Sequence, residues 1–302
     1  MNLANKYRPR EFKNVVGQEY VKEIIGNQIK FNALSNAYLF TGPAGTGKTT
    51  MARILADVIN SDVVEIDAAS NNGVDNIRNI REKCRFKSMK ADKKLYIIDE
   101  VHMLSKGAFN AFLKILEEPP EYVIFILCTT EPDKILPTII SRCQRFDFRR
   151  IEKDKIVTRL QTIAVQENIQ ITQDGLHYIA HLAQGQMRNA ISLLESLSYS
   201  YTDLNLNNIK EIMGNIDELV LLNLLESMMS GDSKSVIKTV ESLYDSGKNI
   251  KMLVKELVEM VLDIRKVVLF RNYEYVNFGV EARDKISDMK QHILDTDLDE
   301  YF

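Results

Sequence analysis

The sequence predicts an α/β domain built on a parallel sheet, followed by a region made only of helices. Up to about residue 150, short apolar runs alternate with helical patterns, which is typical of a parallel sheet wound with helices. From Glu152 onward the strand signal disappears, and apolar residues recur only at helical spacing. The predicted strands are Tyr38–Thr41, Val63–Asp67, Leu95–Asp99, Val123–Cys128 and Arg145–Phe148.

Helices are expected between these strands and throughout the second half. Apolar residues repeat at intervals of three and four from Ala108 to Leu116, and Pro119-Pro120 ends that helix. Four glycines separate the later helical segments, namely Gly185, Gly214, Gly231 and Gly247. The predicted helices of the second half cover residues 152–168, 173–184, 186–199, 205–213, 216–230, 232–246 and 249–271.

The last of these segments carries one continuous apolar stripe. Its members are Ile250, Leu253, Val254, Leu257, Val261, Ile264 and Val268. We favour burial of this stripe within its own helical bundle over a partner-facing role. From Gln291 on, the chain carries four acidic residues and no Lys or Arg, which predicts a solvated tail.

Composition limits the compartment and the partners. The chain has 302 residues, enough for two or three domains with ordinary cores. Cys84, Cys128 and Cys143 are far apart, which fits buried thiols in a reducing compartment. No run approaches the length of a membrane span, and the N-terminus lacks the apolar core of a signal peptide, so we expect a cytoplasmic protein that does not contact a membrane. The formal net charge of −3 means that nucleic-acid contact needs a local basic patch.

The segment from Gly42 to Thr49 matches the phosphate-binding loop G-x-x-x-x-G-K-[ST] at every position. It follows the apolar run Ala37–Phe40 and opens into a helix-favouring segment, which is the strand–loop–helix setting that the motif requires. Glycines allow backbone N–H groups to face the phosphates, Lys48 adds a full positive charge, and the Thr49 hydroxyl can bind Mg²⁺. A chance glycine-rich turn is the less favoured reading.

A second element fits the same chemistry. The apolar strand Leu95–Asp99 ends in two carboxylates, as a Walker B element does. At the carboxyl end of a strand, Asp99 would hold Mg²⁺ through water and Glu100 would polarise the attacking water. A strand running into a solvated acidic loop is the alternative.

Three further residues are candidates to read the γ-phosphate. Thr129 and Thr130 follow a predicted strand and would lie beside Asp99 if the two strands are neighbours, although either could instead cap a turn. Arg188 begins a helix of the second half and could reach the nucleotide from a separate domain. A surface arginine is an equally good reading of that residue.

Together these residues resemble the AAA+ clamp-loader ATPases, most closely the gamma/tau subunit family of bacterial DNA polymerase III. The resemblance covers roughly residues 5–200. It rests on the phosphate-binding loop and on the segments Lys6–Pro9, Phe12, Val15–Gln18, Glu65–Gly73, Ile98–Leu104, Leu116–Pro120 and Ser141–Phe146. The triplet Ser141-Arg142-Cys143 is particularly diagnostic of the family.

The resemblance implies a fold and a domain organisation. It implies a RecA-like AAA+ module with a parallel sheet over residues 1–150, an all-α lid over 151–204, and an all-α collar over 205–302 that closes a five-subunit ring. It also implies ATP and Mg²⁺ as ligands, with other clamp-loader subunits, the sliding clamp and primer–template DNA as partners.

The resemblance also implies site residues. Lys48, Asp99 and Glu100 would be catalytic, and Arg142 would be an arginine finger that reaches the ATP of the neighbouring subunit. Thr49 and Asp99 would hold the metal, Asp99 through water. Thr129 looks like sensor 1, and Gly185–Arg188 looks like the sensor 2 motif. The nucleotide would contact Tyr7, Arg8, Val15 and Val16 at the adenine, with Gln18 close by, and Gly42, Pro43, Gly45, Thr46, Gly47, Lys48, Thr49, Thr50, Thr129 and Arg188 elsewhere.

Three departures from the family matter. Bacterial relatives insert a four-cysteine zinc module where Asn60-Ser61-Asp62 stands here, so we predict no zinc. The chain stops at Phe302, so we expect no long tau-type extension. The collar region looks short for the family, which leaves the ring partners open. His177 and His181 lie four residues apart, but Tyr178 replaces the glutamate that a zincin pair needs, so we read both as structural.

Contacts with DNA and with the clamp would come from the first half. The candidates for DNA backbone contact are Asn71, Asn72, Arg78, Arg81, Ser105 and Lys106, although a solvated helix face is the better reading of either arginine alone. The clamp would dock on the helix at about 74–87 and on the loop Phe86–Met89.

The leading hypothesis is therefore an ATP-hydrolysing motor subunit of a sliding-clamp loader. Two alternatives remain open at this point. One is a different DNA-remodelling AAA+ ATPase, such as a branch-migration motor. The other is a scaffold subunit that binds ATP without hydrolysing it.

Overall fold

The structure is a computed structural model that describes residues 2–89, 91–201, 203–213, 216–273, 276 and 278–295. The chain divides into two compact units, Met1–Asn208 and Ile209–Phe302. The first unit starts with α1 (Leu3–Lys6), η1 (Phe12–Asn14) and α2 (Glu19–Lys30). The α/β region continues with β1 (Ala37–Thr41), α3 (Lys48–Val58), β2 (Asp62–Asp67), α4 (Val74–Cys84), β3 (Lys94–Asp99), η2 (Val101–Met103), α5 (Lys106–Glu117), β4 (Val123–Thr129), η3 (Pro132–Lys134), α6 (Pro137–Ile140) and β5 (Gln144–Asp147).

The five predicted strands form one sheet in the order β2-β3-β4-β1-β5, with every pair parallel. The central strands β1 and β4 are buried along their whole length, as expected for a sheet covered on both faces. The registers place Thr41 opposite Thr129 and Ile98 opposite Leu127, so the carboxyl ends of β1, β3 and β4 meet at one edge. The predicted parallel α/β fold is confirmed.

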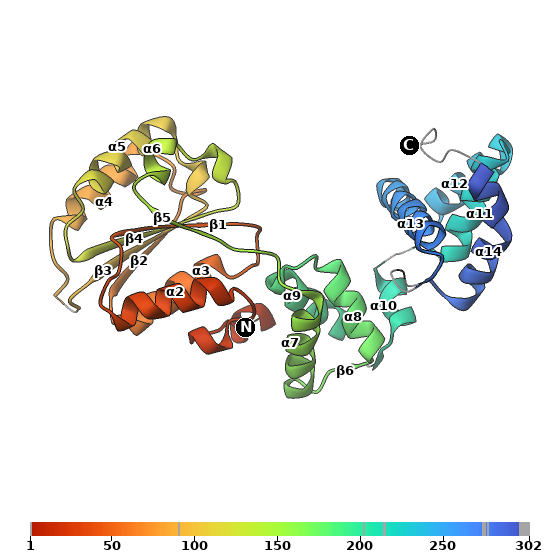
Figure 1. The fold of residues 1–302 in the computed structure, drawn as a ribbon, viewed down its shortest axis with the longest axis horizontal. Coiled ribbons are helices and arrows are strands. Elements are labelled where there is room, and N and C mark those ends of the chain that lie inside the picture. The colour runs from red at the N-terminus through yellow and green to blue at the C-terminus, as the bar shows by residue number, and fades with distance from the viewer. Residues whose placement is uncertain are drawn as a thin grey trace. The chain divides into compact units, whose positions relative to one another are not determined.

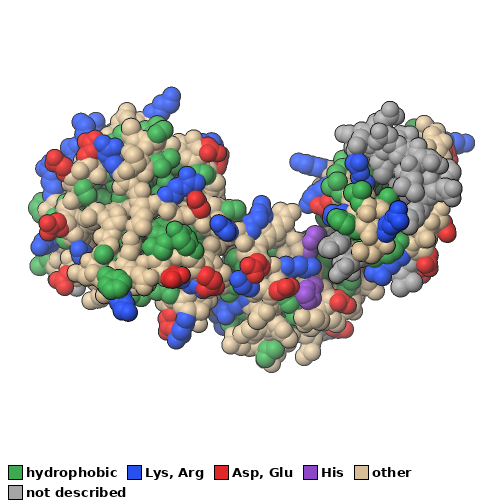
Figure 2. All heavy atoms as spheres, in the orientation of Figure 1, with side chains coloured by type: hydrophobic (Ala, Val, Ile, Leu, Met, Phe, Trp, Pro, Cys, Tyr) green, Lys and Arg blue, Asp and Glu red, His purple; other side chains and the backbone are tan. Residues whose placement is uncertain are grey.

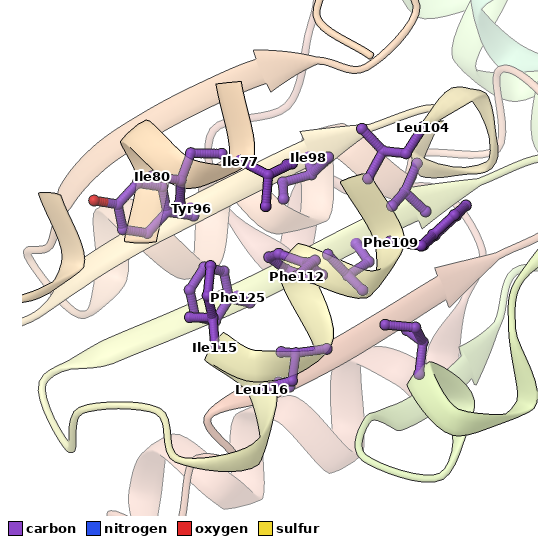
Figure 3. Close-up of a cluster of buried hydrophobic side chains, with 14 of the residues drawn as sticks. Ile77, Ile80, Tyr96, Ile98, Leu104, Phe109, Phe112, Ile115, Leu116 and Phe125 are labelled. Carbon is purple, nitrogen blue, oxygen red and sulfur yellow. The ribbon is translucent and has the colours of Figure 1, made fainter. Parts of the chain in front are cut away.

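Two hydrophobic clusters cover the two faces of this sheet. Helices α4, α5 and α6 lie over one face, and α2 and α3 lie over the other (Figure 1). On the first face, Ile77 and Ile80 of α4 and Phe112 of α5 pack towards Tyr96 and Phe125 of the sheet (Figure 3). The aromatic rings of Phe112 and Phe125 meet edge to face with centroids 5.2 Å apart. The sheet is thus fixed rigidly beneath the loops at its carboxyl edge.

Helices make up most of the first unit after Glu152. They are α7 (Lys153–Gln166), α8 (Gln173–Leu182) and α9 (Met187–Ser198), close to the predicted ranges. The prediction that strands disappear here is wrong, because β6 (Gln170–Ile171) and β7 (Asp203–Leu204) pair in parallel. Two residues are too few to show an alternating pattern, so periodicity could not reveal these strands.

The second unit is built from helices. They are α10 (Leu206–Ile212), which begins in the first unit, and α11 (Glu218–Met229), α12 (Ser233–Asp245), α13 (Ile250–Phe270) and α14 (Val280–Asp295). The predicted apolar stripe of α13 is buried at Leu253, Leu257, Val261 and Ile264, in one hydrophobic cluster with residues of α11 and α14. The stripe prediction is wrong at Val254, whose side chain is 54% exposed.

The predicted solvated tail begins within a helix. Residues 291–295 continue α14, and residues 296–302 lie outside the described part of the chain, so the solvation of this tail stays a prediction. Ala282, Ile286 and Met289 of α14 are buried at helical spacing, which is the signal that would have predicted this helix. None of the helices in the described ranges is both long enough and apolar enough to cross a membrane.

Gly185, between α8 and α9, packs closely against Arg150 and Ile151, which follow the sheet in the chain. Gly185 has a φ of +80°, and its carbonyl accepts the N–H of Ile151 at 3.0 Å. A Cβ at this position would lie 2.6 Å from the Arg150 Cβ and 3.1 Å from the Ile151 backbone nitrogen. Both the backbone conformation and the close approach therefore require glycine.

We predict that Gly185→Ala destabilises the first unit more than Gly17→Ala. Gly17 has a similar φ of +72°, but its nearest neighbour would be 3.8 Å from an added Cβ. The left-handed backbone alone costs about 1 kcal/mol for alanine, so Gly17→Ala should lose about that much and Gly185→Ala at least about 2 kcal/mol. Urea unfolding followed by circular dichroism measures both variants. Equal losses would show that the close approach to Arg150 is not a constraint.

Candidate active site

The loop between β1 and α3 has the backbone of a phosphate-binding loop. Gly42, Gly45 and Gly47 have φ values of +134°, +69° and +104°, which L side chains rarely adopt. A Cβ at Gly42 would lie 2.2 Å from the Phe148 carbonyl oxygen, and one at Gly45 would lie 3.1 Å from the Gln186 Cβ. The glycines therefore allow the turns and the close approaches of a loop that leads into the N-terminus of α3, where an anion is stabilised.

Lys48 is buried at the start of α3, with 6% of its surface exposed. Its ammonium group donates hydrogen bonds to the carbonyls of Gly42 at 2.8 Å and of Pro43 at 2.9 Å. Burial lowers its pKa, and the nearby Asp99 and Glu100 charges oppose that shift. A buried cation held by neutral carbonyls is suited to exchange them for a phosphate.

Thr49 and Asp99 come together at the carboxyl edge of the sheet. The Thr49 hydroxyl donates to Asp99 Oδ2 at 2.8 Å, and Asp99 Oδ1 accepts the N–H of Glu100 at 3.1 Å. A hydroxyl and a carboxylate are the hard oxygen ligands that Mg²⁺ prefers. These two side chains fit the predicted metal site.

One cavity of about 180 Å³ joins most of the predicted site residues. Its lining includes the predicted Tyr7, Arg8, Val15, Val16, Gly45, Thr46, Gly47, Lys48, Thr49, Thr50, Asp99, Glu100 and Arg188. It also includes residues to which no contact was assigned from sequence, namely Ala4, Pro9, Ala44, Ile151, Arg159, Met187 and Ile191. Most of these residues are apolar, and they come from segments that are far apart in the sequence. Their place in the cavity therefore depends on the tertiary fold, which local patterns do not reveal.

The cavity wall formed by the N-terminal segment is tied to helix α7. The Tyr7 hydroxyl donates to Glu167, Lys6 pairs with the same carboxylate at 2.6 Å, and Arg159 donates to the Tyr7 carbonyl at 3.0 Å. Burial lowers the pKa of Arg8, and the neighbouring Arg53 and Arg188 charges lower it further. Converging cations favour an anionic ligand in this cavity.

Helix α9 closes the cavity over the phosphate-binding loop. The N–H of Met187 donates to the Gly45 carbonyl at 3.0 Å, which places Arg188 directly above that loop. Gln18 fastens the loop from the other side, since its amide donates to the carbonyls of Thr46 at 3.3 Å and Arg149 at 2.7 Å. The structure thus brings the segment predicted to be the sensor 2 motif next to the loop.

Five residues predicted for the nucleotide site lie outside the cavity lining, namely Gly42, Pro43, Thr129, Thr130 and Arg142. The carbonyls of Gly42 and Pro43 hold Lys48, as described above. Thr129 is fully buried, and its hydroxyl contacts His102 Nδ1 at 3.0 Å and accepts the N–H of Glu131 at 3.0 Å. The neighbouring Thr130 hydroxyl donates to Glu100 at 3.1 Å. His102 is a residue of this region for which the sequence suggested no role.

Arg142 is the last of these residues outside the cavity lining. Its guanidinium donates to the Thr138 carbonyl at 2.9 Å and pairs with Glu117 at 3.2 Å. Its side chain is 35% exposed. This position leaves Arg142 accessible on the surface of the unit.

Four of the DNA-contact candidates, Asn71, Asn72, Ser105 and Lys106, lie at or just before the N-termini of α4 and α5, whereas Arg78 and Arg81 lie further along α4. The N–H of Ser105 donates to the Asn72 carbonyl at 3.1 Å, so the two segments are adjacent. Ser105 and Lys106 are exposed, as is Arg81, whereas Arg78 pairs with Asp75 at 3.0 Å. Acidic and basic side chains are interspersed over the first unit on the face drawn in Figure 2. Any basic patch is therefore local.

The clamp-docking candidates are solvent-accessible. Beyond α4, Phe86 is 71% exposed and Met89 is fully exposed. Large apolar side chains that face water in this way mark contact surfaces when they cluster.

The remaining side chains that were considered as possible zinc ligands are the histidines and cysteines. Within the part of the chain that is described, no three His, Cys, Asp or Glu side chains group as metal ligands. His177 is half-buried and His181 is exposed. The absence of zinc stays a prediction.

Three protein-family models match successive parts of this chain. Models described as DNA polymerase III delta subunit, clamp loader subunit ATPase lid domain, and subunits gamma and tau domain III match residues 59–152, 155–196 and 204–302 respectively. The gamma subunit of Buchnera aphidicola subsp. Acyrthosiphon pisum is 34% identical, and the alignment covers 87% of this chain and 80% of that protein. This chain belongs to the DNA polymerase III gamma/tau family.

Other gamma/tau relatives are longer. The tau subunit of Bacillus subtilis is 43% identical over 89% of this chain, but the alignment covers 52% of the Bacillus protein. The gamma/tau subunit of Mycoplasma pneumoniae is 38% identical over 95% of this chain, and the alignment covers 44% of the Mycoplasma protein. The chain thus spans about half the length of these curated relatives.

Solved structures confirm the AAA+ fold of this gamma/tau chain. The RuvB Holliday junction branch migration motor of Thermotoga maritima superimposes with a TM-score of 0.59, covering 85% of this chain and 90% of that one. The sequence identity is 18%, so this likeness concerns the fold alone.

The three cysteines of the first unit provide a test of burial, since Cys84 and Cys128 are buried and Cys143 is half-buried. Burial raises the pKa of Cys143 to about 12 and raises that of Cys128 well above its ordinary value, and the pKa of Cys84 also rises. A raised pKa keeps the thiol protonated at pH 8, and the thiolate is the reactive form. We therefore expect all three thiols of the native protein to react slowly with Ellman's reagent at pH 8. In denaturant all three should react rapidly, and rapid labelling of the native protein would contradict the burial.

Proposed function

We propose that the chain is an ATP-hydrolysing motor subunit of a DNA sliding-clamp loader, acting in the cytoplasm. The observation that carries this proposal is the division of the catalytic groups. Lys48, Asp99 and Glu100 line one cavity, whereas Arg142 lies outside it on the surface. Family membership supports a clamp-loader role over a branch-migration motor. A scaffold that does not hydrolyse ATP would not need all four residues.

The cavity residues can bind and orient a nucleoside triphosphate. Backbone N–H groups of the loop and the Lys48 ammonium would hold the phosphates, and Arg188 would approach them from α9. Tyr7, Arg8, Val15 and Val16 would enclose the base. Mg²⁺ held by Thr49 and, through water, Asp99 would neutralise phosphate charge. Glu100 would accept the proton of the attacking water.

Hydrolysis would require a second protomer. Arg142 would extend from the neighbouring subunit of a ring, which we expect to hold five, and stabilise the charge on the transferring phosphoryl group. Nucleotide binding would therefore tighten the ring, and hydrolysis would loosen it.

The clamp and DNA would contact different surfaces of the first unit. The clamp would dock on α4 and on the loop Phe86–Met89, in which the side chains of Phe86 and Met89 are exposed. Primer–template DNA would lie against the N-termini of α4 and α5, near Asn72 and Lys106. Backbone contacts of this kind follow the strand without reading its sequence. DNA bound here would trigger hydrolysis and leave the clamp on the DNA.

We predict that Arg142→Ala abolishes stimulated hydrolysis while ATP binding stays near normal. A finger of this kind can supply on the order of 10³-fold in rate, so turnover in the assembled loader with clamp and primed DNA should fall by about that factor. Phosphate release measures turnover, and a fluorescent ATP analogue measures binding.

The matched control is Arg145→Ala. Arg145 is an exposed arginine three residues later and pairs with Asp147 at 2.8 Å. This control should keep its turnover. Normal stimulated turnover in the Arg142→Ala loader would refute a site shared between subunits.

A further inference from the structure

The Glu100 carboxylate is held by one of its two oxygens. Oε2 accepts a hydrogen bond from the Thr130 hydroxyl at 3.1 Å and lies 3.4 Å from His102 Nδ1. In the described part of the chain, Oε1 has no hydrogen-bond partner. Glu100 lines the cavity beside Asp99. The carboxylate is thus anchored on one side and available on the other.

The backbone of Glu100 is constrained as well. Its φ of +47° lies in the left-handed region, which is uncommon for a residue other than glycine. The turn persists because its N–H donates to Asp99 and because η2 begins at the next residue. Both the backbone and the side chain of Glu100 are therefore directed by their surroundings.

His102 is the buried centre of these surroundings. Its side chain is 7% exposed, and Nδ1 lies 3.0 Å from the Thr129 hydroxyl. Its other nitrogen, Nε2, lies 3.1 Å from Glu131 Oε1, and Glu131 in turn pairs with Lys134 at 2.8 Å. Both ring nitrogens therefore have polar neighbours. Nδ1 faces Glu100 and Thr129, and Nε2 faces Glu131 in the loop after β4.

We propose that His102 is a positioning residue for Glu100. Together with Thr130 it fixes Oε2, so that Oε1 faces the cavity in the orientation that hydrolysis needs. This inference rests on the proposed ATPase function. It assigns His102 no contact with nucleotide, so its loss should lower kcat and leave nucleotide affinity unchanged.

The two ring nitrogens can be tested separately. In His102→Asn, the amide can occupy the Nδ1 side, which faces Glu100 and Thr129. In His102→Gln, the longer side chain can reach the Nε2 side, which faces Glu131. A residue that acts only by packing would not distinguish these two polar variants.

The experiment compares His102→Asn, His102→Gln and His102→Ala in the assembled loader with clamp and primed DNA. Phosphate release gives kcat and KM, and a fluorescent ATP analogue gives Kd. His181→Asn, at an exposed histidine, is the matched control. We expect an approximately tenfold lower kcat for His102→Ala and His102→Gln, because the loss of the polar contact that orients Glu100 should have an effect of about this size. His102→Asn should recover most of the rate, with Kd unchanged in every variant.

Three results would overturn the positioning role. They are an unchanged kcat in all His102 variants, an equal loss in His102→Asn and His102→Gln, and a raised rate without DNA, which would mean that the contacts restrain Glu100. If His102→Ala fails to fold, the comparison of the other two variants still decides. A wild-type loader that binds ATP but never hydrolyses it would refute the proposed function instead.

Discussion

The register of the parallel sheet is the constraint on which the site depends. Because Thr41 pairs with Thr129 and Ile98 with Leu127, three strands end at the same edge. The phosphate-binding loop, the acidic pair at the end of β3 and the threonines at the end of β4 therefore lie close together. A slip of one residue in any of these strands would turn its side chains to the opposite face and separate these groups. The two hydrophobic clusters, which bury both faces of the sheet, prevent such a slip.

The site also depends on segments outside the sheet that line the cavity. The sheet alone supplies the phosphate-binding side, whereas the N-terminal segment, α7 and α9 supply the rest of the wall. The hydrogen bond from Met187 to Gly45 and the cluster of Tyr7, Lys6 and Glu167 link these segments directly. A ligand in the cavity would touch all of these segments at once, so its binding energy is available to change how they pack.

Sequence reasoning succeeded where a short motif determines its own geometry. The phosphate-binding loop, the five strands and the acidic pair could all be predicted, because local spacing sets each of them. His102 could not be assigned a role, since its neighbours come from the loop after β4 and depend on the pairing of β3 with β4. The two-residue strands β6 and β7 were missed because they are too short to show a period. The roles of Thr129, Arg142 and Arg188 remain predictions.

The ion pair between Arg142 and Glu117 has a consequence for assembly. Both side chains are well exposed, at 35% and 52%, so the pair stabilises the isolated protomer by no more than about 1 kcal/mol. Because this ion pair is weak, little stability would be lost in the proposed ring if a triphosphate on an adjoining protomer replaced the carboxylate. The unassembled subunit would thus keep this cation occupied, and the phosphate, with its higher charge, would displace Glu117 as soon as the interface forms.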